Sequence, residues 1–222
     1  STIGELRACT QEEISQIRGM GKRTLKEIYQ KLPSEKAIGK VELNFKPIEY
    51  RSLNRVEFSF DEFSALCKQR HSVRWYQPIP VPRDVIDSAI NLALTAPSAC
   101  NRQPLKFYVF DQPERAQEIG AIPMGTDGFS HNFQCIIVIV GDLSAYPFEK
   151  DRHIIYIDSA LAVMQLQLAL ETMGLGSCII NWPDIERHEK IMAQELCLEP
   201  YERPTMLLSA GYPEESASVP YS

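Results

Sequence analysis

The amino-acid sequence predicts an α/β fold of the α+β type, with a central mixed sheet flanked by helices. Short runs rich in β-branched and aromatic residues alternate with segments whose apolar residues recur at helical spacing. Two of the runs, 136–140 and 206–208, are apolar throughout, which is typical of strands buried on both faces. Helices are therefore expected on both sides of the sheet.

The helices and strands of this fold can be placed along the sequence from their periodicity. Helical segments are expected at 61–69, 82–95, 114–119, 154–173 and 184–195. Strands are expected at 106–111, 135–141, 178–181 and 205–211. Asp158, Gln165 and Gln167 interrupt the most apolar segment, 154–173, which is therefore predicted to be a buried helix rather than a membrane span.

Length and charge limit the classes of protein to which the chain can belong. The chain has 222 residues, enough for one full-sized domain and a small appendage, and its 44 % apolar and 23 % charged content is ordinary for a globular protein. The net charge of -6 argues against nucleic-acid binding by the whole chain, because phosphate binding needs a concentrated positive surface.

The charge is unevenly distributed along the sequence. Residues 1–40 carry eight Lys/Arg and five Asp/Glu, a net charge of +3, which leaves 15 and 24, a net charge of -9, for the rest. Periodicity is weak between Pro33 and Val56. We therefore predict an appendage over residues 1–40, a linker over 41–55 and a main domain over 56–222.

The cysteines show no metal-binding or disulfide pattern. No C-x-x-C pair occurs, and no histidine lies at metal-ligand spacing from Cys9, Cys67, Cys100, Cys135, Cys178 or Cys197. All six are predicted to be free thiols, and no metal site is expected. This usage suits a reducing compartment, and no signal peptide is visible, so a cytoplasmic location is expected.

The first chemistry-bearing stretch is R-H-S-V-R over residues 70–74, which we call the arginine segment. It follows a predicted helix. An arginine fork matches phosphate oxygens and a serine hydroxyl adds a donor, so the segment could hold a phosphomonoester. Taken alone, such a pattern is more often a solvated helix end whose basic residues complement the helix dipole.

The second stretch is A-P-S-A-C-N-R-Q-P over residues 96–104, which we call the amide loop. Two prolines restrict its backbone, while Asn101 and Gln103 offer donors and acceptors suited to the edge of a flat heterocycle. The alternative is a turn whose amides satisfy their own backbone. A third stretch, 173–182, contains G-L-G-S at 174–177, where Gly174 is explained as a helix C-cap.

These three stretches, in this order and followed by G-Y-P at 211–213, resemble the nitroreductase-like family of FMN-dependent oxidoreductases over about residues 60–213. The resemblance implies a nitroreductase-like sandwich that forms an intertwined homodimer with FMN at the subunit interface. It also implies a ping-pong reaction, in which NADPH or NADH reduces the flavin at N5 and a small electron-poor acceptor then reoxidises it. A nitro compound, a quinone or a specific metabolite would serve as acceptor.

The resemblance assigns a cofactor-binding role to ten residues: Arg70, His71, Ser72, Arg74, Pro97, Ser98, Asn101, Gln103, Ile180 and Asn181. Those of the arginine segment are similar to contacts with the FMN phosphate and ribityl chain, with Arg74 reaching the pyrimidine side of the ring. A positive charge there favours the reduced flavin. The amide-loop residues correspond to contacts with the ring edge.

No protein nucleophile is implied by the resemblance. Hydride transfer would occur at flavin N5, assisted by Arg74, Asn101 and Asn181. The acceptor pocket is expected near 124–133 and Trp182. Family members usually carry a basic residue after G-Y-P, whereas this chain ends at 218–222 without one. If the chain ends there, phosphate binding is expected to depend on Arg70 and Arg74 alone; a longer chain could supply the basic residue beyond Ser222. Flavin breakdown and reductive dehalogenation remain alternative reactions of the same fold.

The N-terminal residues resemble the helix-hairpin-helix of the bacterial RNA polymerase alpha C-terminal domain. Thr10 can cap a helix, and Gly19 and Gly21 separate it from a second helical run that carries Lys22 and Arg23. Glycines and cations can contact DNA phosphates, but the modest charge favours a structural or protein-docking role. A flavin- or redox-responsive regulator whose hairpin contacts DNA or a protein partner is therefore the alternative function.

Overall fold

The computed structural model describes residues 49–221, and the chain divides into two compact units, Ser1–Glu57 and Phe58–Ser222. In the first unit the described residues form one short 3-10 turn, Tyr50–Ser52. The predicted appendage over 1–40, Cys9 and most of the predicted linker lie outside the described residues. The boundaries at 40 and 55 therefore stay predictions.

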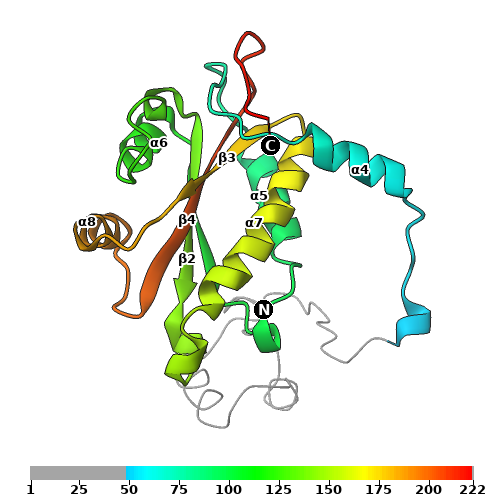
Figure 1. Ribbon diagram of the computed structural model, residues 1–222, viewed down its shortest axis with the longest axis horizontal. Coiled ribbons are helices and arrows are strands. Elements are labelled where there is room, and N and C mark those ends of the chain that lie inside the picture. The colour runs from blue at the N-terminus through cyan, green and yellow to red at the C-terminus, as the bar shows by residue number, and fades with distance from the viewer. Residues whose placement is uncertain (1–48, 222) are drawn as a thin grey trace, which may run out of the picture. The chain divides into compact units, whose positions relative to one another are not determined.

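The second unit is built on a four-stranded sheet in the order β1-β2-β4-β3 (Figure 1). The strands are β1 (Leu105–Phe110), β2 (Cys135–Asp142), β3 (Gly176–Asn181) and β4 (Glu202–Gly211). All three strand pairings are antiparallel. The α+β class is confirmed, but the sheet expected to be mixed is antiparallel among the described strands. Apolar strands buried on both faces occur in either arrangement, so their composition left the strand direction undetermined.

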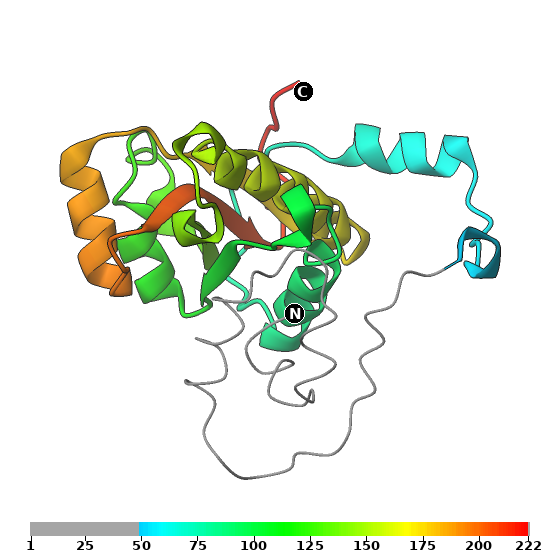
Figure 2. The same ribbon diagram turned by 90° about the horizontal axis from the view of Figure 1, so that it is seen from below.

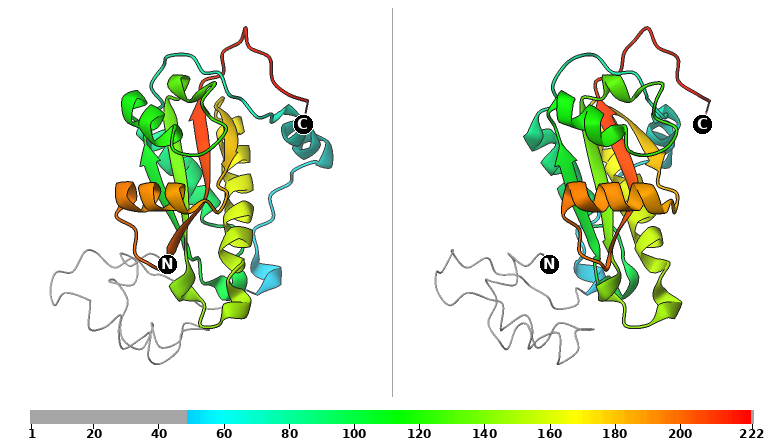
Figure 3. Two further views of the ribbon diagram at one scale, coloured as in Figure 1. Left: turned by 60° about the vertical axis from the view of Figure 1, so that its left-hand side comes forward. Right: turned by 90° about the vertical axis from the view of Figure 1, so that its left-hand side faces the viewer.

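Helices cover both faces of the sheet, as the apolar strands predicted (Figures 1 and 3). One layer contains α5 (Arg83–Ala93) and α7 (Ile154–Thr172), and the other contains α6 (Pro113–Gly120) and α8 (Glu186–Leu196). Each layer encloses its own core of buried side chains against β2 and β4. Alternate residues of β2 point into the two cores, since Ile137 and Ile139 belong to one, and Ile136 and Val138 to the other.

The longest helix, α7, spans most of the length of the sheet. Apolar residues such as Val163 and Leu166 are fully buried against the strands, and the polar Asp158 and Gln167 are also buried, with 3 % of each exposed. By length and composition alone, the helical stretch Glu149–Thr172 is the one candidate membrane span among the described residues, and half of its most apolar window is buried within the protein. Its packing against the sheet is that of a core helix, as predicted.

The remaining helix, α4 (Phe60–Gln69), precedes the arginine segment and contacts α7. It begins with a capping box in which Ser59 and Glu62 satisfy each other's backbone N–H groups. None of its residues is buried, and Phe60 and Phe63 are 80 % and 46 % exposed. Figure 2 shows α4 extending away from the sheet. The apolar side chains of this helix are therefore largely exposed in the described part of the protein.

Candidate functional site

The arginine segment is extended and lies along β3. Ser72 forms a parallel bridge with Ser177, and the Val73 N–H donates to the Ser177 carbonyl over 3.0 Å. The close approach requires a glycine in β3, because a Cβ at Gly176 would lie 2.7 Å from a methyl of Val73. Backbone pairing therefore joins the first and third motif stretches, which are a hundred residues apart in sequence.

Alternate residues of an extended segment share one face, so Arg70, Ser72 and Arg74 are expected on the same side. The environment of Cys178 supports this arrangement. Burial raises the pKa of the Cys178 thiol, and the Arg74 guanidinium, the Ser72 hydroxyl and the positive charge of Arg70 oppose that rise. The two arginines and the serine thus gather on one side of the segment, above the buried thiol of β3.

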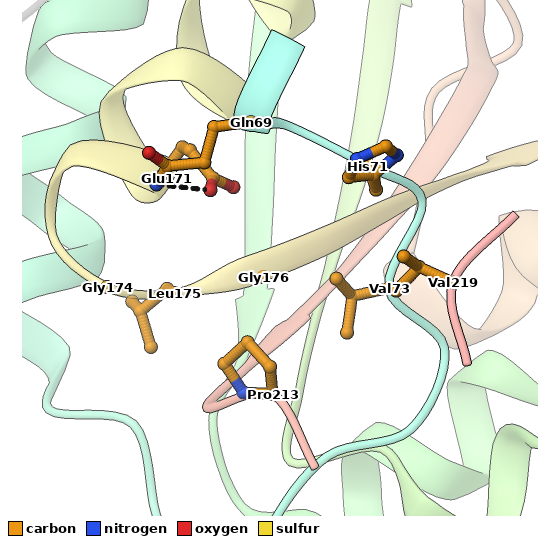
Figure 4. A pocket seen from close by; sticks show the side chains of 9 residues that line it. All are labelled: Gln69, His71, Val73, Glu171, Gly174, Leu175, Gly176, Pro213 and Val219. Carbon is orange, nitrogen blue, oxygen red and sulfur yellow. Dashed lines mark hydrogen bonds between the residues drawn. The ribbon is translucent and has the colours of Figure 1, made fainter. Parts of the chain in front are cut away.

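His71 and Val73 border a separate cavity of about 300 Å³ (Figure 4). The Nδ1 atom of the His71 ring lies 3.2 Å from the Pro220 carbonyl oxygen, so the backbone after β4 returns to this segment. Gln69 at the end of α4 donates to the Glu171 carboxylate of α7 over 2.9 Å. The arginine segment is therefore attached to the C-terminal end of α7.

Asn132 holds the C-terminal part of the arginine segment, a role that the sequence did not reveal. Its Oδ1 accepts from the Tyr76 N–H at 2.9 Å, and its Nδ2 donates to the Arg74 carbonyl at 3.0 Å. The Arg74 guanidinium lies 5.8 Å from the centre of the Phe129 ring. The region 124–133, expected to border the acceptor pocket, thus contacts the arginine that is expected to meet the flavin.

The amide loop has an unusual backbone. Cys100, Asn101 and Gln103 have φ angles of 55°, 51° and 47°, in the left-handed region that L-residues rarely occupy. The Gln103 N–H donates to the Ser98 hydroxyl over 2.9 Å, and the Gln103 side-chain amide donates to the Leu94 carbonyl over 3.2 Å. These bonds match the alternative of a turn that satisfies its own backbone, whereas the Asn101 side chain is exposed.

The amide loop is attached to the N-terminal half of α7. The N–H of Ala99 donates to both carboxylate oxygens of Asp158, at 3.2 and 3.3 Å. Pro97 and Ser98 line a small cavity that Asp158 also borders. In the sequence, Asp158 appears only as a polar residue that interrupts an apolar helix. Its contact with the amide loop could not be predicted because the burial of its side chain is visible only in the structure.

Two residues at the end of β3 are predicted to bind the cofactor, and only one of them is exposed. Asn181 is exposed, while 5 % of Ile180 is exposed and its side chain packs in the core with Val73. The Ile180 side chain is therefore part of the core. Trp182 is also buried, and its indole N–H donates to the Glu189 carboxylate over 2.5 Å. The Trp182 ring therefore belongs to the core and does not line an open acceptor pocket.

The two donor-bearing segments attach to α7 at different ends. The arginine segment is attached near Glu171 and the amide loop at Asp158, thirteen residues earlier on the same helix. A rise of 1.5 Å per residue places those attachment points about 20 Å apart along α7. A single chain thus brings together Arg70, Ser72 and Arg74 beside β3, but it does not bring Asn101 to them.

The chain is thus an α+β protein with a helix layer on each face of its sheet, and its arginine segment pairs with β3. The Nitroreductase family matches residues 67–126 and 112–212, which is more than half of the sequence. The chain belongs to the nitroreductase family, whose members are oxidoreductases. The family of the C-terminal domain of the bacterial RNA polymerase alpha subunit matches residues 1–34, outside the described residues.

Individual relatives agree with this family. A Methanothermobacter thermautotrophicus protein, provisionally named NADH dehydrogenase/NAD(P)H nitroreductase, is 26 % identical over 67 % of this chain and 76 % of its own length. Iodotyrosine deiodinase from Danio rerio is 37 % identical over 34 % of this chain, but the match spans only 26 % of that protein. The structure of an FMN-dependent nitroreductase from Clostridium difficile has a TM-score of 0.61 at 25 % identity, covering 70 % of this chain and 90 % of that one.

Proposed function

We propose that this protein is an FMN-dependent oxidoreductase that transfers two electrons from NADPH or NADH to a small electron-poor acceptor. One observation carries the proposal. The extended arginine segment holds Arg70, Ser72 and Arg74 on one face by pairing with β3. Two guanidinium groups and a hydroxyl in this order form a donor set suited to a phosphomonoester, as in FMN.

The other predicted residues also have the chemistry that FMN requires. Asn101 and Asn181 are exposed and offer amide donors for the edge and centre of a flavin ring. Arg74 is exposed, and no carboxylate of the described residues forms an ion pair with it. Its positive charge can therefore stabilise negative charge on a bound group. The donor set fits the cofactor named for the Clostridium difficile relative.

When bound, FMN would supply the hydride chemistry, receiving two electrons from the nicotinamide and giving them to the acceptor in a ping-pong sequence. Arg74 would favour the reduced form through its charge, and Asn181 would orient a donor toward the reacting atom. The described residues need supply no nucleophile for such transfer. Their work is to bind the cofactor, orient it and keep one face of the ring accessible to both substrates in turn.

The site requires a second copy of the protein. The arginine segment and the amide loop attach about 20 Å apart on α7, so one subunit alone does not bring both to one ring. A groove of about 690 Å³ runs beside the amide loop and is lined by Pro97, Phe63 and apolar residues of α7. Ile157, Leu161 and Met164 on α7 are 54 %, 44 % and 41 % exposed. We propose that a second copy covers this stripe and supplies the missing half of each site.

The visible absorption spectrum of the purified protein tests the proposal. We expect flavin peaks, present on purification or after FMN is supplied, that bleach on anaerobic addition of NADPH or NADH. Nitroaromatics, quinones and halogenated phenols added afterwards would then identify the acceptor class by the return of the peaks. A protein that takes up no FMN at any concentration would refute the proposal.

A second candidate function follows from the match of residues 1–34 to the RNA polymerase alpha C-terminal domain. In this alternative the flavin domain senses redox state, and the N-terminal region contacts DNA or a protein partner. Duplex binding should then weaken with salt and change when the flavin is reduced. Absent or salt-insensitive DNA binding, together with full reductase turnover in a 41–222 truncation, would exclude the DNA-binding form of this regulator.

A further inference from the structure

Asp158 carries a carboxylate that is buried without a paired cation among the described residues, which costs free energy. Only 3 % of it is exposed, and no cation of the described residues forms an ion pair with it. Such a group is stable only if hydrogen bonds replace its lost hydration. Its partners are the Ala99 N–H, at 3.2 and 3.3 Å, and the Tyr146 hydroxyl, which donates over 2.7 Å. Neither partner belongs to the core.

Both partners lead to the amide loop. Ala99 directly precedes the left-handed residues Cys100 and Asn101. The Tyr146 ring lies 5.3 Å beneath the Arg102 guanidinium, and Arg102 also donates to the backbone carbonyl of Ala145. One carboxylate on α7 therefore holds the loop at its first turn and, through Tyr146, at the position between its left-handed residues.

The loop needs such an anchor. A left-handed backbone is unfavourable for any residue with a Cβ, and three such residues within four positions persist only where surrounding contacts impose them. The Gln103 N–H donates to the Ser98 hydroxyl, a bond that closes the loop on itself. Ala99 joins the loop itself to α7 through its bonds to Asp158, and Gln165 of α7 donates to the Thr95 hydroxyl just before the loop.

We propose that Asp158 is a positioning residue for the flavin: it keeps the amide loop in its left-handed conformation and thereby presents the exposed Asn101 to the ring edge. This inference deepens the proposed function and rests on it. Without the carboxylate, the loop relaxes toward the ordinary right-handed backbone and Asn101 turns away from the cofactor. The arginine segment, attached at the other end of α7, keeps its geometry.

Asp158→Ala and Tyr146→Phe in the full-length protein test the inference, with Ser159→Ala as the matched control. Ser159 is the next residue of α7, is fully buried, and bonds to Ile155 and Thr205 rather than to the loop. We expect Asp158→Ala to raise the Kd for FMN about tenfold, the size of one hydrogen bond to a charged group, with Tyr146→Phe giving a smaller rise. Ser159→Ala should lower thermal stability and leave the Kd within about twofold.

Hydrogen exchange of the flavin-free proteins gives a second readout. Asp158→Ala, or Tyr146→Phe if the first variant fails to fold, should accelerate amide exchange at 99–103 while exchange at 72–74 stays unchanged. Folded variants with wild-type exchange at 99–103 would overturn the inference whether or not FMN binds. Wild-type protein that binds no FMN would instead overturn the proposed function, so the two failures are distinguishable.

Discussion

The arginine segment and the amide loop are both predicted to contact one flavin, but they are held in place by opposite means. The arginine segment is extended and pairs its backbone with β3, which is possible because Gly176 lacks a side chain. The amide loop has a left-handed backbone and depends on the side chain of Asp158. The first arrangement is therefore sensitive to an added group, and the second to a removed one.

Among the changes that test this comparison, adding a methyl group to β3 should have the largest effect on stability. In Gly176→Ala the new Cβ would lie 2.7 to 2.9 Å from three atoms of Val73, so the arginine segment must move. We expect the free energy of unfolding to fall by about 1–3 kcal/mol in urea titrations, as for other overpacked sites. Gly128→Ala is the control, since nothing lies within 4 Å of its Cβ. Equal stability of the two variants would contradict the close packing of the segment.

Removing either arginine should weaken the binding of the cofactor without unfolding the protein. We expect Arg70→Ala and Arg74→Ala each to raise the Kd for FMN about tenfold, about 1.4 kcal/mol, because each loses a charge-assisted contact. Arg74→Ala should also lower the flavin midpoint potential. Arg187→Ala, an exposed arginine on α8, controls for net charge. If Kd and potential are unchanged in both variants, the assignment of the arginine segment is wrong.

The thiols of the two regions should respond differently to alkaline pH. Burial raises the pKa of Cys178 above its ordinary value of 9.0, whereas Cys100 in the amide loop is exposed. The folded state keeps the Cys178 proton to a higher pH than the unfolded state does. The contribution of Cys178 to stability is therefore complete well below pH 9 and is lost as the pH rises through and above 9.

We expect Cys178 to contribute a loss of stability as the pH rises from 8 to 10, at most about 1.4 kcal/mol per pH unit, measured by urea titration of flavin-free protein. Cys178→Ala should reduce the dependence of stability on pH over this range, and the remaining slope reflects other buried groups such as Cys135, whose pKa burial raises to about 12. Cys100→Ala should leave it unchanged. The same slope in both variants would show that the thiol beneath the arginine segment is more hydrated than its burial indicates.

The smallest effect is expected from relieving the steric strain in the backbone of the amide loop. Cys100→Gly permits the left-handed conformation without a steric penalty, and the entropy that glycine loses on folding offsets part of that gain. We expect a rise in stability of about 0.5 kcal/mol in thermal melts, and a fall of similar size in the control Ala99→Gly. A stability loss in both variants would show that the conformation at Cys100 is not strained.

Much of the fold follows from periodicity and end signals. The helix expected at 154–173 is found at Ile154–Thr172, and Gly174 ends it with a φ of 76°, as a left-handed C-cap requires. The strand expected at 205–211 begins earlier, at Glu202. The buried Glu202 carboxylate pairs with Lys106 on β1, and this long-range contact leaves no local pattern in the sequence.

The candidate site was less accessible to prediction. Its donors could be named because arginine, serine and amide side chains have distinct chemistry. The anchors could not, since Asn132 and Asp158 act through residues distant in sequence. The left-handed conformation of Gln103 was equally hidden, because no glycine marks it. Assignment of each predicted residue to a flavin contact remains a prediction that the variants above can test.

The distance of about 20 Å between the two attachment points on α7 has a thermodynamic consequence. A cofactor held by two subunits is linked to their association by mass action, so FMN would tighten the pair and dilution would release both together. Flavin content would then depend on protein concentration as well as on FMN concentration. At a fixed FMN concentration, the abundance of the protein would then set its active fraction.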